Sequence, residues 1–395
     1  MTRPAPNLRP ESNVPPADGP CRIGHRDGAS GASARLPDPY AAATRATPSS
    51  AARPLVGITI GDPAGIGAEV TVKALADPAV RDLGRFVMYG LSDAVQRAAE
   101  RAGVSPFWFE VTRDDAASID TGVVLVHVDG CEDAPPGPPR PTTSGGAASL
   151  RFVDEAVRAA KAGRLDALVT GPIHKVAWRL AGCRFPGHTE RLADAFGVKR
   201  VTMMFVADDL RVALASTHVA LMDLRNIFTI GHVFQPIDLL DDALRCWFRV
   251  ARPRIAVAAL NPHAGEDGQF GDEEKRIIEP AVLMAQAAGI DVEGPVPADT
   301  LFTPQVRDRY DGIVAMYHDQ GLIPVKLLAF HAAVNVTLGL PIIRTSVDHG
   351  PAFDRAGTNQ ADPGSMTAAV RLACGLAHRA AAQRSSTRHV PVTAS

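Results

Sequence analysis

The sequence predicts an α/β protein built on a largely parallel β-sheet with helices on both faces. Two observations support this prediction. Short runs rich in Val, Ile and Leu recur along the chain, and longer Ala-rich segments with helical spacing lie between many of them. With 395 residues, of which 46% are hydrophobic and 21% charged, the chain has enough apolar side chains for two domains or one large α/β unit.

The expected strands are runs of β-branched and apolar residues, a composition that favours extended backbone. In chain order these runs are residues 55–60, 86–89, 123–128, 167–170, 201–206, 212–216, 255–260, 313–316, 334–338 and 342–345. The clearest expected helices are residues 147–162, 239–250, 273–288 and 366–377. Alternation of the two kinds of element is what predicts parallel pairing.

Both ends of the chain are predicted to be tails. Residues 1–53 are rich in Pro, Ala, Arg and Ser and show no periodic apolar pattern, so they are expected to be disordered. They also lack the apolar stretch of a secretory signal. Residues 379–395 are low in apolar content and are expected to fray. The folded region is therefore expected to span 54–378, and the Pro-rich stretch 134–141 is a candidate linker.

Composition excludes several classes of protein. A formal net charge of -2 argues against a nucleic-acid partner or an anionic membrane surface. No apolar stretch is long enough for a membrane-spanning helix. The cysteines are far apart and form no C-x-x-C pair, which favours reduced thiols in a cytoplasmic protein. They are Cys21, Cys131, Cys183, Cys246 and Cys374.

Three histidines follow three of the predicted strands. His218 comes after residues 212–216, His263 after 255–260 and His318 after 313–316. Parallel sheets bind ligands at the carboxyl ends of their strands, so these imidazoles are candidates to meet around one cation. Imidazole nitrogens suit Zn, Co or Mn. The alternative is that each histidine is only a hydrogen-bonded loop residue.

A second group of residues is suited to an anion. Lys326 and Arg344 lie in apolar surroundings, with Asn335 between them in the sequence, and Arg is the donor best matched to phosphate or carboxylate. Residues 187–190 follow a Phe-Pro pair and are a candidate helix start, where free backbone N–H groups favour anions. The alternative is that the two cations are ordinary solvated surface charges.

Two turns complete the candidate site. Residues 61–67 (GDPAGIG) join a predicted strand to a predicted helix, and their glycines allow backbone to approach a ligand closely. Residues 348–357 (DHGPAFDRAG) precede the last predicted helix and are a candidate adenosine site or only a loop. Neither matches the G-x-G-x-x-G or P-loop pattern.

These residues belong to motifs by which the sequence resembles the 4-hydroxythreonine-4-phosphate dehydrogenase family. The motifs occur in the family's order and span residues 55 to about 377. They are GDPAGIGAE (61–69), TGPIHK (170–175), GHTE (187–190), STHVAL (216–221), LNPHAGEDGQFGDEE (260–274), PADT (297–300), YHDQGLIPVK (317–326) and NVTLGLPIIRTSVDHG (335–350).

The resemblance implies a fold like that of isocitrate and isopropylmalate dehydrogenases, with two subdomains and a cleft between them. The chain would cross between subdomains near 134–145 and again near 320–340. The resemblance also implies a homodimer with NAD or NADP and one divalent cation (Zn, Mg, Mn or Co) per site. His218, His263 and His318 match the family's metal ligands, one of which comes from the partner subunit in such enzymes.

The remaining site residues are also carried over from the resemblance. Substrate contacts fall on His188, Thr189, Lys326, Asn335 and Arg344, and catalytic roles on Asp299 and Lys326. The cofactor candidates are Gly61, Asp62, Gly65, Asp348, His349, Gly350, Asp354 and Gly357. Two positions depart from the family pattern: Ala68 replaces a usual Pro, and Pro351, which lacks an N–H, replaces a usual Thr.

The resemblance implies oxidation of the C3 hydroxyl of 4-phosphooxy-L-threonine, followed by decarboxylation to 3-amino-2-oxopropyl phosphate, a precursor in pyridoxal phosphate synthesis. One alternative is catabolic oxidation of 4-phospho-D-threonate or 4-phospho-D-erythronate. Oxidation of dihydrodiols of aromatic dicarboxylates is disfavoured by the intact GHTE motif and by Arg344. A second alternative is a non-catalytic protein that binds a phosphorylated ligand.

Overall fold

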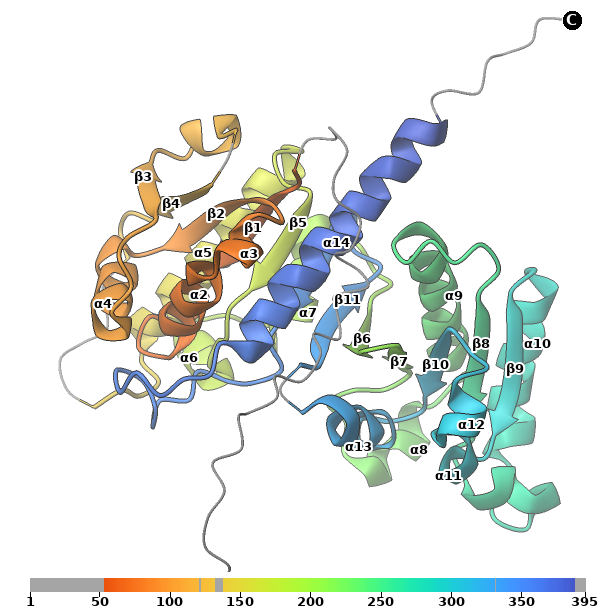
Figure 1. Cartoon of the computed structure of the whole chain (residues 1–395). Coiled ribbons are helices and arrows are strands. Elements are labelled where there is room, and N and C mark those ends of the chain that lie inside the picture. The colour runs from red at the N-terminus through yellow and green to blue at the C-terminus, as the bar shows by residue number, and fades with distance from the viewer. Residues whose placement is uncertain (1–52, 121, 132–137, 331, 388–395) are drawn as a thin grey trace, which may run out of the picture. The chain divides into compact units, whose positions relative to one another are not determined.

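The computed structural model describes residues 53–120, 122–131, 138–330 and 332–387. A 12-stranded sheet runs through these residues in the order β3-β4-β2-β1-β5-β12-β11-β6-β7-β10-β8-β9 (Figure 1). Its strands are β1 Leu55–Thr59, β2 Arg85–Gly90, β3 Trp108–Val111, β4 Val123–His127, β5 Ala167–Thr170, β6 Thr202–Ala207, β7 Leu210–Leu214, β8 Arg254–Ala258, β9 Asp291–Val296, β10 Gly312–Ala315, β11 Val334–Leu338 and β12 Ile343–Ser346.

Helices connect most of the strands. The α-helices are α2 Gly67–Ala76, α3 Pro78–Arg81, α4 Ser92–Ala102, α5 Thr143–Lys161, α6 Lys175–Leu180, α7 His188–Phe196, α8 Leu224–Ile227, α9 Ile230–Cys246, α10 Glu279–Ala287, α11 Ala298–Leu301, α12 Pro304–Arg307, α13 His318–Ala329 and α14 Gly364–Thr387. Shorter helical turns are η1 Asp115–Ser118, η2 Leu221–Asp223, η3 Pro262–Gly268 and η4 Glu274–Ile278. None of the helices among the described residues has the length and apolar character needed to cross a membrane.

The sheet is parallel except near its middle. β11 is antiparallel to both of its neighbours, β12 and β6, and β6 is antiparallel to β7. The pairs on either side of this region, such as β1 with β5 and β10 with β8, are parallel. The predicted α/β class with a mostly parallel sheet is therefore confirmed.

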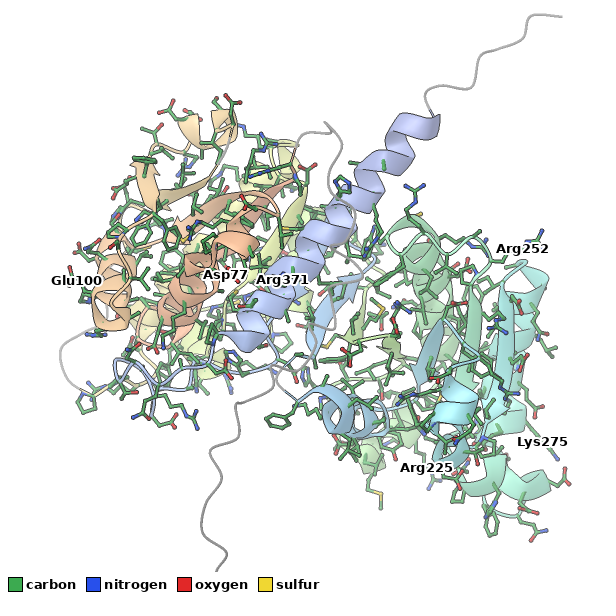
Figure 2. All side chains as sticks on the ribbon, viewed as in Figure 1. Asp77, Glu100, Arg225, Arg252, Lys275 and Arg371 are labelled. Carbon is green, nitrogen blue, oxygen red and sulfur yellow. The ribbon has the colours of Figure 1, made fainter. Side chains whose placement is uncertain are left out.

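Helices cover both faces of the central strands. Every residue of β1, β5, β11 and β12 is buried, which requires packing on each side of the sheet. α5 packs on β1, β2 and β5, whereas α14 packs on β5, β11 and β12 and also touches α2 and α9. Figure 2 shows Arg371 of α14 close to Asp77, the N-cap of α3, and their charged atoms are 3.5 Å apart.

The predicted strands and helices agree with the structure to within a few residues, apart from α9 and α14, which are longer than expected, and β3 and β9, which were missed. β3 is at one edge of the sheet and is at most half-buried, so it lacks a strong apolar signal. β9 is at the other edge, and its Gly294-Pro295 pair is atypical of a strand interior. α9 begins at Ile230, earlier than predicted, and includes Pro236.

Two predicted boundaries can be compared with the described residues. Residues 138–142 lead from β4 into α5, and both elements pack with β2, so the chain is still in this part of the sheet where α5 begins. It passes from β5 to β6 by way of α6 and α7. The second boundary is the start of the predicted C-terminal tail at residue 379, whereas α14 continues to Thr387, and Arg379 donates a hydrogen bond to the Trp247 carbonyl.

Other boundary predictions stay predictions. The expected N-terminal tail lies outside the described residues as far as residue 52, as do residues 388–395. One continuous sheet joins all the described strands, so the division into two subdomains also stays a prediction. Within the expected second crossing, 320–340, β11 pairs with β6 on one side and with β12 on the other.

Candidate active site

A pocket of about 290 Å³ lies over the middle of the sheet. Its floor consists of side chains that share one face of neighbouring strands, as the strand register requires: Asn335 of β11 is paired with Phe205 of β6 and with Ser346 of β12. Loops and helix starts form its walls. The remaining lining residues are Gly171, Pro172, Ile173, Lys175, Gly187, His188, Thr189, Glu190, Met203, His218, His318, Arg344, Val347, Asp348, His349 and Gly350.

Arg344 brings a buried positive charge to the pocket. The residue is only 2% exposed, and its guanidinium donates hydrogen bonds to the hydroxyls of Thr170 (2.6 Å) and Thr337 (2.9 Å). Burial lowers the pKa of Arg344 to about 9, and the nearby Glu190 carboxylate opposes this shift. Arg344 therefore stays charged at neutral pH with neutral hydrogen-bond partners, an arrangement suited to an anionic ligand.

The start of α7 lines the pocket beside Arg344. Gly187 is its N-cap and contributes no side-chain cap, so the first N–H groups of the helix, at His188 and Thr189, lie at the pocket wall. The His188 ring packs edge-on against Trp178, with centroids 5.1 Å apart. Burial and the charge of Arg344 hold the pKa of His188 well below its usual value, so the ring is neutral at pH 7.

Three buried polar atoms of the pocket have no hydrogen-bond partner among the described residues. They are Nε2 of His188, Oδ1 of Asn335 and Nε2 of His349. Buried polar atoms are normally satisfied, so unpaired ones that share a pocket indicate a polar ligand. Together with the buried Arg344 guanidinium, they suit a compact molecule that carries an anionic group.

His218 and His318 come together as the sequence predicts. They follow β7 and β10, which are parallel neighbours, and their ring centroids are 6.1 Å apart. Lys175 Nζ lies 3.5 Å from His218 Nε2. Burial, and then the charge of Lys175, lower the pKa of His218, which favours the neutral imidazole that binds metals.

His263 does not join them within this chain. It follows β8 in η3, where residues 263–267 all have positive φ, so the backbone turns in the left-handed sense. Lys275, labelled in Figure 2, lies 3.4 Å from Asp267 of this turn. The His263 side chain is 68% exposed and is absent from the pocket lining. Accordingly, no group of three metal-ligating side chains forms within the part of the chain that the structure describes.

The two residues predicted to be catalytic also lie outside the pocket lining. Asp299, on α11, is exposed, and its carboxylate accepts a hydrogen bond from the next backbone N–H, that of Thr300 (2.8 Å). Lys326, on α13, forms an ion pair with Asp348 (3.0 Å), a pocket residue, and is therefore at the edge of the site. The structure brings Lys326 to the pocket region but not Asp299.

The two predicted cofactor turns contact each other. The Ile66 N–H donates a hydrogen bond to the carbonyl of Pro351 (2.9 Å). Gly61 needs a positive φ of 78° and would place a Cβ only 2.2 Å from the Pro172 carbonyl oxygen, so this turn accepts no side chain there. Asp62 is buried, and burial raises its pKa.

The predicted cofactor residues do not all reach the pocket. Asp348, His349 and Gly350 line it, whereas Gly61, Asp62, Gly65, Asp354 and Gly357 do not. Asp354 and Gly357 are exposed.

Sequence reasoning missed several residues that shape the pocket. Thr170 and Thr337 orient Arg344, and Lys175 approaches His218. Glu190 lines the pocket from the first turn of α7. Thr170, Lys175 and Glu190 all lie in the motifs TGPIHK and GHTE. Lys175 comes five residues after the predicted strand 167–170, so its place near a strand end was a signal that could have found it.

A comparison of sequence profiles identifies the family. The profile of the pyridoxal phosphate biosynthetic protein PdxA family matches residues 82–373, well over half of the chain. The chain belongs to this family. The resemblance drawn from the sequence motifs is therefore confirmed.

Individual relatives of the PdxA family agree with this assignment. A protein of Geobacter metallireducens named 4-hydroxythreonine-4-phosphate dehydrogenase is 47% identical, covering 82% of this chain and 96% of its own length. A relative of the same name from Caulobacter vibrioides is 45% identical, covering 83% and 98%. The crystal structure of the Klebsiella pneumoniae 4-hydroxythreonine-4-phosphate dehydrogenase is 38% identical, with a TM-score of 0.75, covering 83% and 99%.

A more distant structure shares the fold. It is a terephthalate 1,2-cis-dihydrodiol dehydrogenase from Burkholderia xenovorans, 31% identical, with a TM-score of 0.58, covering 82% of this chain and 98% of its own. The names of these relatives refer to dehydrogenases of different substrates, so similarity alone leaves the substrate of this chain to be inferred from its pocket residues.

Proposed function

We propose that this protein is an NAD(P)-dependent dehydrogenase that oxidises the C3 hydroxyl of 4-phosphooxy-L-threonine and then decarboxylates the product. The observation that carries the proposal is the pocket in which Arg344 lies near the unpaired Asn335 Oδ1 and His188 Nε2, beside the His218–His318 pair. The names of the relatives support the same substrate. The proposal includes a homodimer and a cytoplasmic location, as the sequence predicts.

In this proposal the chain's own residues bind and orient the substrate. Arg344, Asn335, His188 and Thr189 hold the phosphate or the carboxylate, and Lys326 adds a positive charge at the edge of the pocket. Fixing both ends of a small molecule places its C3 carbon in one position, which is a large part of the rate enhancement that an enzyme provides.

A divalent cation fits the histidine pair. Two imidazole rings with centroids 6.1 Å apart could share one ion, and His263 of a second copy would supply the third nitrogen. Such an ion lowers the pKa of a hydroxyl that contacts it and polarises a carbonyl. Lys175, 3.5 Å from His218, would have to turn away when that imidazole binds a cation.

The proposed reaction has two steps, an oxidation and a decarboxylation. Breaking the C3–H bond transfers a hydride to NAD⁺ or NADP⁺, and the hydroxyl proton leaves, so that C3 becomes a ketone β to the carboxylate. Breaking the C1–C2 bond releases CO₂, and a proton adds at C2 to give 3-amino-2-oxopropyl phosphate. Asp299 stays a candidate proton acceptor only if assembly brings it to the pocket, because it is exposed in this chain.

The test is a spectrophotometric assay of the purified full chain for NADH or NADPH formation. The substrates are 4-phosphooxy-L-threonine, 4-phospho-D-threonate and 4-phospho-D-erythronate, each with and without prior treatment with a chelator. We expect the amino acid to be oxidised with the highest kcat/KM, and the chelator to abolish turnover until a divalent cation is restored. Preference for a phosphorylated sugar acid would favour the catabolic alternative, and tight binding without turnover of any substrate would favour a binding protein.

A further inference from the structure

Glu190 is an acidic side chain in a pocket that is otherwise suited to anions. It lies in the first turn of α7 and is half-buried at the pocket wall. Its carboxylate folds back over the start of the helix, with Oε2 3.6 Å from the position that a Cβ of Gly187 would take. It interacts electrostatically with Arg344 and His218, but no hydrogen bond or ion pair of Glu190 forms among the described residues.

The other acid of the pocket is already paired. Asp348 lies 3.0 Å from Lys326 Nζ, so its charge is neutralised within the chain. Of the pocket-lining residues that the structure describes, Glu190 is therefore the carboxylate without an ion-pair partner. A half-buried carboxylate without such a partner loses part of its hydration, and no protein group compensates for the free energy that this costs.

The ligand's chemistry can supply the missing partner. The amino acid of the proposed function carries two anionic groups and one ammonium group, whereas the corresponding sugar acid carries a hydroxyl where the ammonium is. Arg344 and the start of α7 suit the anionic groups but offer nothing to a cation. An ammonium that enters the pocket needs an acceptor, and Glu190 is the carboxylate placed to provide it.

We infer that Glu190 binds the α-ammonium group of the substrate and thereby makes the pocket selective for a phosphorylated amino acid over the matching phosphorylated hydroxy acid. The inference rests on the proposed function for the identity of the ligand. It adds a residue that determines specificity. The hydrogen bond that this carboxylate accepts from a neutral hydroxyl would be weaker than the one it accepts from an ammonium.

Two ligands that differ at one position test the inference. Calorimetric titration of the full chain, in magnesium buffer without NAD, compares 4-phosphooxy-L-threonine with its 2-hydroxy analogue of the same configuration at C2 and C3. In Glu190→Gln we expect the affinity for the amino acid to fall about 10- to 100-fold, as expected for the loss of a charge-assisted hydrogen bond. The affinity for the 2-hydroxy analogue should change about twofold at most.

A control carboxylate lies on the same helix. Asp194 forms ion pairs with Arg184 (3.0 Å) and Arg191 (3.7 Å) and does not line the pocket. Asp194→Asn should leave both affinities unchanged, and Glu190→Asp should recover part of the preference for the amino acid. Thermal unfolding of each variant checks that the fold is intact.

Equal losses for the two ligands in Glu190→Gln would overturn the inference, because they would mean that the carboxylate only balances Arg344, Lys175 or the helix start. Unchanged affinity for the amino acid would overturn it as well. The titration measures no turnover. A chain that binds the amino acid through Glu190 without oxidising it would contradict the proposed function and leave this inference standing.

Discussion

Arg344 holds a positive charge beneath the pocket with the hydroxyls of Thr170 and Thr337 as its partners. Removing a guanidinium from water in this way costs free energy, since neutral hydroxyls replace only part of its hydration. The ligand's anionic group would supply the missing charge. The residue therefore serves binding at the expense of the stability of the free protein, a trade-off common in active sites.

Replacing this charge should separate the two effects. In Arg344→Met we expect the KM for the phosphorylated substrate to rise at least about 100-fold, which corresponds to the loss of a buried charge-assisted contact of about 3 kcal/mol. The free energy of unfolding of the ligand-free variant should stay the same or increase. Steady-state kinetics and urea unfolding measure the two quantities. A rise in the KM for NAD⁺ alone would show that Arg344 serves the cofactor instead.

The pH dependence of stability should contain a contribution from His188. Its pKa in the folded chain is held well below the unfolded value, so in acid the unfolded chain binds a proton that the folded chain does not. Stability should therefore fall as the pH drops below about 6.5, by at most about 1.4 kcal/mol per pH unit. The loss continues until the pH reaches the lowered folded-state pKa.

His188→Gln should remove this contribution. Its urea-unfolding free energy should decline less than that of the wild-type chain between pH 7 and pH 5. Parallel curves for the two proteins over this range would contradict the lowered pKa. The matched control is His232→Gln. His232 is in the first turn of α9, forms a hydrogen bond with Thr229, the N-cap of that helix, and does not line the pocket.

Sequence predicts elements better than it predicts loops in this chain, for a physical reason. Buried strands such as β1 and β11 need apolar side chains at every position, and that requirement is visible in the sequence. The positions of His218 and His318 follow from it, since parallel strands carry their carboxyl ends to the same edge. The position of His263 could not be predicted in this way. The backbone of η3 turns in the left-handed sense at non-glycine residues, and residue propensities do not predict such a turn.

Polar contacts between residues far apart in the sequence could not be predicted either. Glu190 and Lys175 acquire their positions from how α7 and α6 pack against α5, and the periodicity of the sequence does not predict that packing. What identified the region was the family's motifs. The chemistry of each residue in it required the structure.

At the scale of elements, a partly buried ion pair attaches the segment after the predicted cofactor loop to α2. Lys73 Nζ contacts Glu69 (2.8 Å) and the carbonyls of Asn359 and Ala361 (3.0 Å each), and the Ala361 N–H donates a hydrogen bond to Glu69. Three hydrogen bonds from the Lys73 ammonium therefore hold the end of the segment 348–361 against α2. The loop is held a second time by the Ile66–Pro351 hydrogen bond.

Lys73→Met should loosen this attachment. We expect a loss of about 3 kcal/mol of stability, because a buried carboxylate is left without its cation. If the loop binds the cofactor, the KM for NAD⁺ should rise at least about 10-fold, with a smaller change in the KM for the phosphorylated substrate. Arg276→Met is the control, since Arg276 forms an exposed pair with Asp272. Equal effects of the two substitutions on NAD⁺ would argue against the loop as a cofactor site.

At the scale of the whole molecule, the third metal ligand is the feature that one chain does not supply. If His263 reaches the histidine pair of a second copy, then His218→Ala and His263→Ala each inactivate every site of their own homodimer. A heterodimer of the two variants contains one site with both substitutions and one site with neither, because the two-fold symmetry exchanges the contributions. Random pairing should restore about one quarter of the wild-type activity.

Co-expression of the two variants with different affinity tags allows the heterodimer to be isolated and assayed directly, with light scattering to confirm its mass. The heterodimer alone should show about half of the wild-type rate per dimer. Heterodimers of His218→Ala with His318→Ala are the matched control. Both substituted residues belong to the pair held within one chain, so every site lacks one of them and activity should not return. No recovery in the first pair would show that His263 is not contributed by the partner subunit. Recovery in the control would show that His218 and His318 of one chain do not serve the same site. Either result would mean that the metal assignment has to be abandoned.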